Sequence, residues 1–229
     1  MNLSTQISRA HLAAGAIYNL DKPAGWTSFD VVNKLRSASR VKKVGHAGTL
    51  DPFATGVLLL CFGPATKQVE QLMQLDKEYT GILELGQETD THDITGKVVA
   101  TGAVPPLSQE DLTQHAQRYV CEIMQTPPMF SALKKEGRRL YDLARSGESV
   151  EVQPRLVTIY SLDIAAVQLP EVTIRMTCSR GTYVRALARD LGKDLGCGAY
   201  LKSLRRTRIG SYTVAQSLSV QQFVERLID

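Results

Sequence analysis

Apolar and polar residues alternate most clearly between Val172 and Ser179, over eight positions. This period of two is typical of a strand with one buried and one solvated face. Two short apolar runs, Ala16–Leu20 and Val57–Phe62, and the segment Lys77–Leu85 predict three more strands. The chain is therefore expected to contain a sheet with strands from both of its halves.

Helical spacing follows directly after the alternating stretch. Beyond Gly181, apolar residues recur at i, i+3, i+4 and i+7 from Val184, which predicts a helix that ends near Gly192. A weaker apolar pattern predicts a helix at Val69–Met73. Three further helices are indicated by capping boxes, in which a Ser or Thr stands three residues before an Asp or Gln: Thr27 with Asp30, Ser108 with Asp111, and Ser219 with Gln222.

The order of these elements favours an α+β fold. Strands and helices intermix without the regular alternation of a doubly wound parallel sheet, so we expect a central mixed, mainly antiparallel sheet flanked by helices. Gly45, Gly48, Pro52 and Gly56 interrupt regular structure, which predicts a loop over 44–55 that enters the strand at Val57.

Composition limits the class of protein. A chain of 229 residues with 43% hydrophobic content can form one large core or two modest lobes that share a sheet. Its longest apolar run, Val57–Phe62, is six residues long, whereas a membrane-spanning helix needs about twenty. There is no signal-peptide pattern and no Cys-x-x-Cys pair, so we expect a cytoplasmic protein with reduced thiols and no metal.

Charge is distributed unevenly. The net charge is +4, but Val31–Leu50, Ser131–Arg145 and Cys178–Gly210 are rich in Lys and Arg, while Gln68–His115 is acidic. If the three basic segments met on one face, that face would follow a phosphate backbone. The commoner alternative is that such runs are ordinary solvated surface.

One carboxylate occupies a position suited to chemistry. Asp51 lies on a glycine-flanked loop directly before an apolar strand, and loops on rigid scaffolds often carry catalytic side chains. The alternative is structural: Asp followed by Pro is a common helix start, with Asp as the N-cap, and spacing alone favours it. His46 in the same loop has no second His or Cys nearby, so it suggests no metal site.

The loop sequence Gly45-His46-Ala47-Gly48-Thr49-Leu50-Asp51-Pro52 resembles the signature of the bacterial tRNA pseudouridine-55 synthase family, of TruB type. Further motifs stand in family order from about Ile17 to about Gly210, and they are Asp21-Lys22-Pro23-Ala24-Gly25, Lys77-Glu78-Tyr79, Thr89-Asp90-Thr91-His92-Asp93, Gln125-Thr126-Pro127-Pro128 with Ser131-Ala132, Cys178-Ser179-Arg180-Gly181-Thr182-Tyr183-Val184-Arg185, and Leu204-Arg205-Arg206.

The resemblance implies the pseudouridine synthase fold and a role for each matching residue. Asp51 corresponds to the essential carboxylate, which either attacks the anomeric carbon or removes a proton from the neighbouring ribose carbon; both routes remain open. Arg185 matches the arginine that pairs with this carboxylate. Tyr79 matches the active-site tyrosine, although strand packing alone would explain a tyrosine there.

Four other residues are expected to bind substrate. His46 matches a residue that holds the flipped-out RNA loop, Asp90 an RNA-loop contact, and Tyr183 a pocket residue. Lys22 belongs to a turn that supports the active-site loop in the family.

The implied function is conversion of uridine 55 in the T loop of tRNA to pseudouridine, by base flipping and without a cofactor. The expected partner is the T stem-loop of tRNA, with no membrane, no obligatory protein partner and a monomeric state. Residues 1–229 are expected to form the catalytic domain, with the usual C-terminal RNA-binding domain absent or nearly so.

Three other functions remain as alternatives. The chain could be the catalytic subunit of a guide-RNA ribonucleoprotein, which shares this domain, or a non-catalytic RNA-binding module. It could also be a carboxylate-dependent hydrolase, which would need a second acid opposite Asp51 at glycosidase separation.

Overall fold

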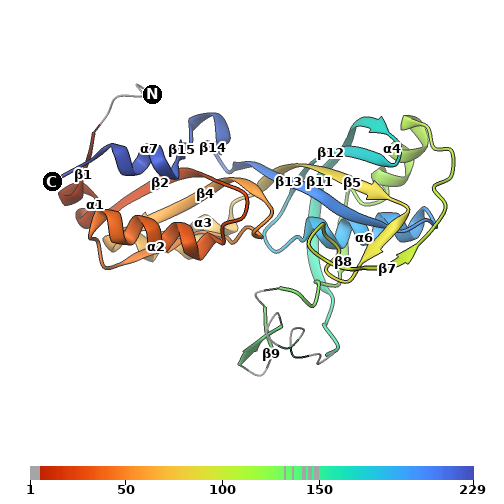
Figure 1. Ribbon diagram of the computed structural model, residues 1–229, viewed down its shortest axis with the longest axis horizontal. Helices are drawn as coiled ribbons and strands as arrows, with labels where there is room; N and C mark the ends of the chain where they lie inside the picture. The colour runs from red at the N-terminus through yellow and green to blue at the C-terminus, as the bar shows by residue number, and fades with distance from the viewer. Residues whose placement is uncertain (1–5, 132, 136, 141–142, 144–145, 147–149) are drawn as a thin grey trace. The chain divides into compact units, whose positions relative to one another are not determined.

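The computed structural model describes residues 6–131, 133–135, 137–140, 143, 146 and 150–229 (Figure 1). The chain forms two compact units. Unit 1 combines Met1–Tyr79 with Leu204–Asp229, and unit 2 is Thr80–Ser203. Strands β5 (Lys77–Leu85) and β13 (Ala199–Ile209) contribute residues to both. The motif residue Ala132 lies outside the described residues, and the basic segment 131–145 lies partly outside them.

Unit 1 is built on a mixed sheet. Strands β2 (Ala16–Lys22) and β4 (Thr55–Phe62) pair antiparallel, and β3 (Val44–His46) also pairs antiparallel with β4. Strand β13 runs parallel to β4 and β15 (Leu218–Ser219) parallel to β2. Short strands complete the unit: β14 (Tyr212–Thr213) on β13, and β1 (Ile7–Ser8) with β16 (Leu227–Ile228).

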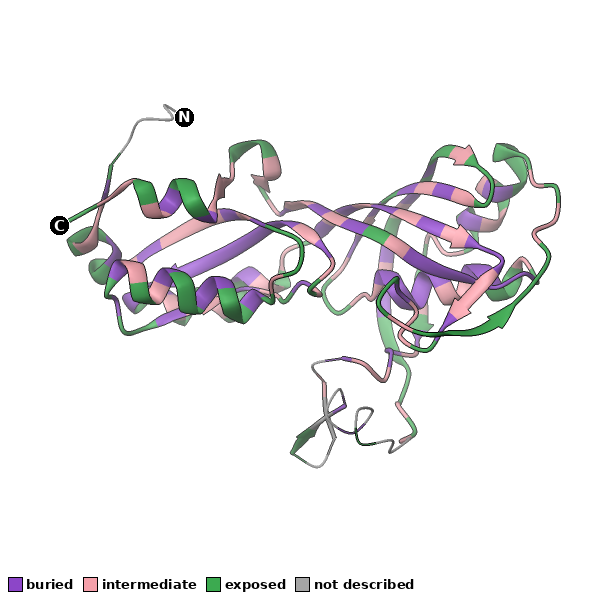
Figure 2. Ribbon diagram, in the orientation of Figure 1, coloured by how far each residue is buried: buried purple, intermediate pink, exposed green. Residues whose placement is uncertain are grey.

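Helices cover both faces of this sheet. They are α1 (Arg9–Gly15), α2 (Ser28–Ser39), η1 (Gly63–Gln68), α3 (Val69–Gln74), η2 (Val214–Gln216) and α7 (Val220–Glu225). Alternate residues of β4 enter two different clusters: Leu58, Leu60 and Phe62 pack with α2 and α7, while Val57, Leu59 and Cys61 pack on the other side. Burial on both faces explains why β4 is a continuous apolar run rather than an alternating one (Figure 2).

Unit 2 contains an antiparallel sheet in the order β13, β5, β12 (Glu171–Cys178), β11 (Arg155–Gln168), β8 (Glu122–Gln125). Its helices are α4 (Gln109–Gln117) and α6 (Val184–Asp194). Strands β6 (Gln87–Thr89) and β7 (Val98–Thr101) form a hairpin, as do β9 (Lys134–Lys135) and β10 (Arg138–Arg139). Buried and half-buried residues alternate along β5, as expected for a strand with one face on the core.

The predicted α+β fold with a mixed, mainly antiparallel sheet is confirmed. All three predicted capping boxes form, with both reciprocal hydrogen bonds in each. None of the helices in the described part of the chain is long and apolar enough to cross a bilayer.

One local prediction around the 44–55 loop was wrong, and the structural alternative for Asp51 does not hold. Val44–His46 forms strand β3, because tertiary pairing with β4 outweighs the glycine punctuation. Asp51 is not a helix N-cap either: the backbone after it makes a single turn, closed by the Ala54 N–H donating to the Asp51 carbonyl at 3.1 Å, and then enters β4.

Gly56, at the start of β4, should be intolerant of any side chain. Its φ is +105°, and an added Cβ would lie 2.8 Å from the Arg206 backbone nitrogen and closer still to the Arg206 carbonyl oxygen. Gly56→Ala is expected to lower the free energy of unfolding by about 3 kcal/mol or more, since steric overlap adds to the positive-φ penalty. Urea denaturation measures this loss.

Gly25→Ala is the matched control. Gly25 also has a positive φ, +79°, but an added Cβ would meet nothing within 4 Å. It should therefore lose only about 1–2 kcal/mol, the cost of the backbone conformation alone. Equal losses in the two variants would show that the β4–β13 approach is not as tight as described.

Candidate active site

Asp51 lies half-buried in the loop that joins β3 to β4. The hydroxyl of Ser28, at the start of α2, accepts a hydrogen bond from the Leu50 N–H at 2.9 Å and lies 3.3 Å from the Leu50 carbonyl. On the other side of Asp51, the Gly25 N–H donates to the Pro52 carbonyl at 2.8 Å. The backbone on both sides of the carboxylate is therefore attached to the α2 segment.

Lys22 reinforces this attachment from inside the protein. The side chain is fully buried, and its ammonium donates to the carbonyls of Pro23 at 2.8 Å, Trp26 at 2.6 Å and Pro52 at 3.2 Å. Burial lowers the pKa of Lys22 to about 8, and the negative charge of Asp51 opposes that shift. Lys22 thus contacts backbone carbonyls and lies near Asp51, with none of its surface open to solvent.

His46 ends strand β3, where it pairs in register with Leu60. Its pKa is lowered, mainly by burial and secondly by the positive charge of Arg206. Among the described residues, none hydrogen-bonds its buried Nδ1 atom. A lowered pKa favours the neutral imidazole, which suits contact with a base or ribose better than pairing with a phosphate.

Tyr79 lies on β5, at the end of unit 1, and is 8% exposed. It occupies one of the buried positions in the alternation of that strand. Lys22, His46, Asp51 and Tyr79 therefore all belong to unit 1.

Arg185 lies in the first turn of α6 in unit 2 and is 3% exposed. Its Nη1 atom is 3.3 Å from the Asp93 carboxylate and donates to the Thr91 carbonyl at 3.0 Å, while Nη2 donates to the Phe130 carbonyl at 2.9 Å. These contacts fix the guanidinium in one orientation.

Asp93 was not selected from the sequence, although it ends a motif that was. It is buried, and its Oδ1 atom accepts from the Thr91 hydroxyl at 2.8 Å and from the N–H and hydroxyl of Thr95 at 2.9 and 2.5 Å. Two threonines that flank an aspartate at two-residue spacing are the local signal that could have identified it.

Asp90 has a different environment from Asp93. It is exposed, and its Oδ1 accepts from the Lys97 N–H at 2.9 Å, while the Asp90 N–H donates to the Lys97 carbonyl at 3.0 Å. Next to it, His92 has a positive φ of 59° and a pKa lowered to about 4, chiefly by burial and then by Arg189 and Arg185. Asp90 thus closes the β6–β7 hairpin with one side of its carboxylate.

Tyr183 is the N-cap residue of α6, two positions before Arg185. The buried amide of Gln125 brackets its backbone: the Tyr183 N–H donates to Oε1 at 2.8 Å, and Nε2 donates to the Tyr183 carbonyl at 3.1 Å. Gln125 therefore fixes the start of the helix that carries Arg185, a role the sequence did not reveal.

Asp90, Tyr183 and Arg185 all belong to unit 2. The pairing of Asp51 with Arg185 would join the two units, and it stays a prediction.

The basic segment Cys178–Gly210 contains few cations available to a phosphate backbone. Most of its members contact acids of the protein itself: Arg185 with Asp93, Arg189 with Asp190, Lys202 with Glu84 and Glu171, Arg205 with Asp21, and Arg208 with Glu78. The first basic segment differs, because Lys34, Arg40, Lys42 and Lys43 are exposed.

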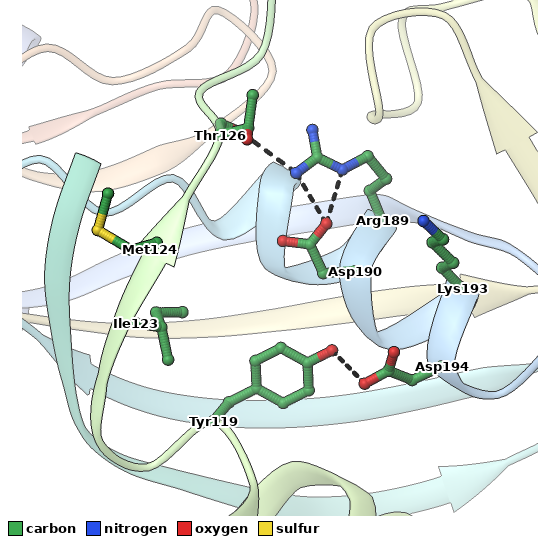
Figure 3. A pocket seen from close by; sticks show the side chains of 8 residues that line it. All are labelled: Tyr119, Ile123, Met124, Thr126, Arg189, Asp190, Lys193 and Asp194. Carbon is green, nitrogen blue, oxygen red and sulfur yellow. Dashed lines mark hydrogen bonds and ion pairs between the residues drawn. The ribbon is translucent and has the colours of Figure 1, made fainter. Parts of the chain in front are cut away.

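A cavity of about 330 Å³ opens on unit 2 between β8 and α6 (Figure 3). The Tyr119 hydroxyl donates to Asp194 at 2.6 Å, and Arg189 contacts Asp190 at 2.7 Å and the Thr126 carbonyl at 3.2 Å. Burial raises the pKa of Asp190, and Arg189 opposes the shift. None of the predicted site residues lines this cavity, and its charged groups largely satisfy one another.

The charge environment of Lys22 gives a test of the geometry around Asp51. We expect Lys22 to titrate near pH 8, and its pKa to fall in Asp51→Asn because that variant removes the acid that raises it. NMR titration of the Lys22 ε-methylene measures both values. Since the folded pKa lies below the ordinary 10.5, stability contributed by this group rises between about pH 8 and 10.5.

Asp30→Asn is the control for that titration. Asp30 also raises the pKa of Lys22, but less than Asp51 does, so its replacement should lower the pKa by a smaller amount. A larger fall in Asp30→Asn than in Asp51→Asn would contradict the placement of Asp51 beside Lys22.

Gln125→Met should destabilise unit 2, because it keeps the length of the side chain but removes the hydrogen bond to the Tyr183 N–H and one of the two hydrogen bonds to the Tyr183 carbonyl, which also accepts from the Leu187 N–H. We expect a loss of about 1–3 kcal/mol in the free energy of unfolding, measured by chemical denaturation. Gln114→Met, at an exposed position of α4, should change it by less than about 0.5 kcal/mol. Similar losses in the free energy of unfolding for the two variants would show that the Gln125 amide does not hold the Tyr183 backbone.

Several curated proteins resemble this chain over most of its length. A protein of Phocaeicola vulgatus named tRNA pseudouridine synthase B is 45% identical over 219 residues, which cover 93% of each chain. One of Geotalea uraniireducens with the same name is 48% identical over 210 residues, covering 92% of this chain and 68% of the relative.

Solved structures share the fold. The structure titled "Crystal Structure of a Cbf5-Nop10-Gar1 Complex" matches with a TM-score of 0.74 and 28% identity over 94% of this chain. This chain spans about half of that protein, 55% of its length.

The family comparison covers most of the sequence. Residues 36–184 match the TruB family pseudouridylate synthase (N terminal domain), and residues 185–228 match the tRNA pseudouridylate synthase B C-terminal domain. A match over more than half of the chain, together with relatives above 40% identity, shows that the chain belongs to the TruB family of pseudouridylate synthases.

Proposed function

We propose that this protein converts uridine 55 in the T loop of tRNA to pseudouridine, with Asp51 as the catalytic carboxylate. The observation that carries the proposal is the 45% identity to a tRNA pseudouridine synthase B over 93% of both chains. The firmly held loop around Asp51 supports it, because the reaction needs a carboxylate at a fixed position beside the ribose.

The reaction breaks the bond between the anomeric carbon and nitrogen 1 of uracil and forms one to carbon 5. Asp51 acts either as the nucleophile at the anomeric carbon or as the base that removes the proton from the adjacent ribose carbon. Each route requires the ionised carboxylate. In the first route the bond from Asp51 to the anomeric carbon breaks as carbon 5 attacks, and in the second the proton returns from Asp51 to the ribose carbon. The proton lost from carbon 5 is replaced by one on nitrogen 1, so atoms balance within the nucleotide and the proposal includes no cofactor.

Arg185 is proposed to pair with Asp51 and orient it. Its rigid support in unit 2 suits this role, because a guanidinium already fixed by Asp93 loses little freedom when it binds a second carboxylate. Tyr79 is proposed to stack on the extruded uracil, and Tyr183 to line the pocket.

His46 and Asp90 are proposed to contact the RNA loop. The lowered pKa of His46 supports contact through a neutral ring, and the exposed side of Asp90 leaves an acceptor for a base or ribose group. Lys22 is proposed to support the Asp51 loop through its three carbonyl contacts.

The tRNA backbone is proposed to follow the exposed cations Lys34, Arg40, Lys42 and Lys43 of unit 1. Lys34 lies on α2, and the other three lie between α2 and β3, in the segment that leads to His46. We further propose that residues 1–229 act together as one catalytic domain, as a monomer in the cytoplasm without an obligatory protein partner.

A guide-RNA-dependent reaction is the weaker candidate. The two structures whose titles name Cbf5 share the fold at 26–28% identity, whereas the curated tRNA pseudouridine synthase B proteins reach 41–48%. The higher identity favours a tRNA substrate without a guide.

Asp51→Asn tests the proposal directly. We expect turnover on unmodified tRNA to fall by at least about 1000-fold, because the amide can neither attack nor accept the proton, while the Kd for tRNA changes little. Chemical mapping of pseudouridine on the product measures both the rate and the position. A tRNA with cytidine at position 55 should remain unmodified.

Asp163→Asn is the control, because Asp163 is an exposed acid on β11. Its turnover should equal that of the unsubstituted protein. Modification at other uridines instead of position 55 would overturn the site preference, and normal turnover by Asp51→Asn would overturn the role of the carboxylate.

A further inference from the structure

Two consecutive arginines on β13 have opposite environments. Successive side chains of a strand point to opposite faces, and Arg205 reaches Asp21 at 2.6 Å and the Thr55 hydroxyl at 3.1 Å from a partly exposed position. Arg206 is 1% exposed and is among the largest fully buried side chains described. The pair thus offers one surface arginine and one interior arginine at adjacent positions.

The guanidinium of Arg206 is directed at backbone carbonyls around Asp51. Its Nε donates to the Val57 carbonyl at 2.7 Å, Nη1 to the Thr49 carbonyl at 3.3 Å and Nη2 to the Gly48 carbonyl at 3.1 Å. Gly48 and Thr49 immediately precede Leu50 and Asp51 in the loop. One side chain therefore links the loop to Val57, the third residue of β4.

These contacts are unusual for a buried arginine. Among the described residues, no carboxylate lies within ion-pair distance of Arg206, so carbonyl dipoles alone solvate its charge. Burying a cation without a counter-ion is unfavourable, and an apolar residue would fill this space more cheaply. Structural packing alone therefore does not explain an arginine at this position.

The charge of Arg206 also acts on two residues of the proposed site. It contributes to the lowered pKa of both Lys22 and His46, which places the guanidinium close to each of them. Its backbone is also tied to the loop's exit, since β13 meets β4 at the pair Arg206 and Gly56. Arg206 thus contacts the Asp51 loop before and after the carboxylate.

We propose that Arg206 is a positioning residue for the reaction, which holds the backbone of Gly48 and Thr49 so that the Asp51 carboxylate is presented at one fixed position. The inference rests on the proposed function of Asp51. Arg206 does not touch the substrate; it acts through the loop. Each of the three carbonyls accepts from a different nitrogen of the planar guanidinium, and the compact ammonium of lysine does not reproduce that spacing, so lysine is a poor substitute.

The test compares Arg206→Met and Arg206→Lys with Arg205→Met in the full chain. We expect kcat on tRNA to fall by at least about 100-fold in Arg206→Met, because a displacement of about 1 Å at a reacting group has an effect of that size, while KM and the Kd for tRNA stay within about threefold. Arg206→Lys should be nearly as slow. Arg205→Met should keep kcat within about threefold.

Added guanidinium or methylguanidinium separates positioning from general loss of structure. Such ions can occupy the space left in Arg206→Ala and restore part of kcat, whereas they should not affect Arg205→Ala. A rise in KM with kcat unchanged in the Arg206 variants would overturn the proposal. An equal fall of kcat in the Arg205 and Arg206 variants would overturn it as well. If Arg206→Met fails to fold, Arg206→Lys and the rescued Arg206→Ala provide the same comparison.

A second measurement does not depend on catalysis. Removal of the Arg206 charge should raise the pKa of Lys22, and loss of its hydrogen bonds should speed hydrogen exchange at the amides of 48–51. If Arg206→Met leaves hydrogen exchange at the amides of 48–51 unchanged, the inference is wrong, whether or not the variant is active. Conversely, the unsubstituted protein could modify no tRNA while Arg206→Met still shows faster hydrogen exchange at 48–51. That result would overturn the proposed function but would support the structural role of Arg206 in holding the loop.

Discussion

The geometry around Asp51 depends on two buried cations that bind backbone carbonyls. Lys22 donates to three carbonyls and Arg206 to three more, and these carbonyls come from the turn after β2, the loop before β4 and β4 itself. Irregular backbone in an interior has no ladder to satisfy its polar groups, so side chains must do so. Because the donors are charged, each contact is stronger than a neutral hydrogen bond, and the loop gains rigidity that its own sequence does not provide.

Unit 2 fixes its arginine in a different way. Arg185 has a buried carboxylate beside it, and Asp93 in turn is held by the hydroxyls of Thr91 and Thr95. Gln125 secures the helix start two residues earlier. In unit 2 the ion pair therefore fixes the orientation of a side chain, the Arg185 guanidinium. In unit 1 the carbonyl contacts of Lys22 and Arg206 fix the position of a backbone segment. Each unit therefore uses the arrangement that suits the group it has to position.

The sequence predicted what local interactions determine and missed what distant partners determine. Capping boxes and the strand at 77–85 follow from neighbours in the chain, so the structure agrees with them closely. The contacts of Arg206 with Gly48 and Thr49 join residues more than 150 positions apart, and no spacing rule reveals them. The basic segment at 178–210 is instructive for the same reason: its charges suggested RNA binding, yet half of them meet acids elsewhere in the fold.

The buried cations also bear on the charge state of Asp51. Lys22 and Arg206 repel each other, which helps to lower the pKa of Lys22, while Asp51 acts in the opposite direction. An attraction between two charges acts on both, so the cation that Asp51 stabilises also favours the ionised form of Asp51. A protonated Asp51 would remove the negative charge that most strongly raises the pKa of the buried Lys22, which is unfavourable for the ammonium in a poorly solvated region. The Lys22 ammonium, which helps to fix the loop in space, therefore also favours the carboxylate form that either chemical route requires.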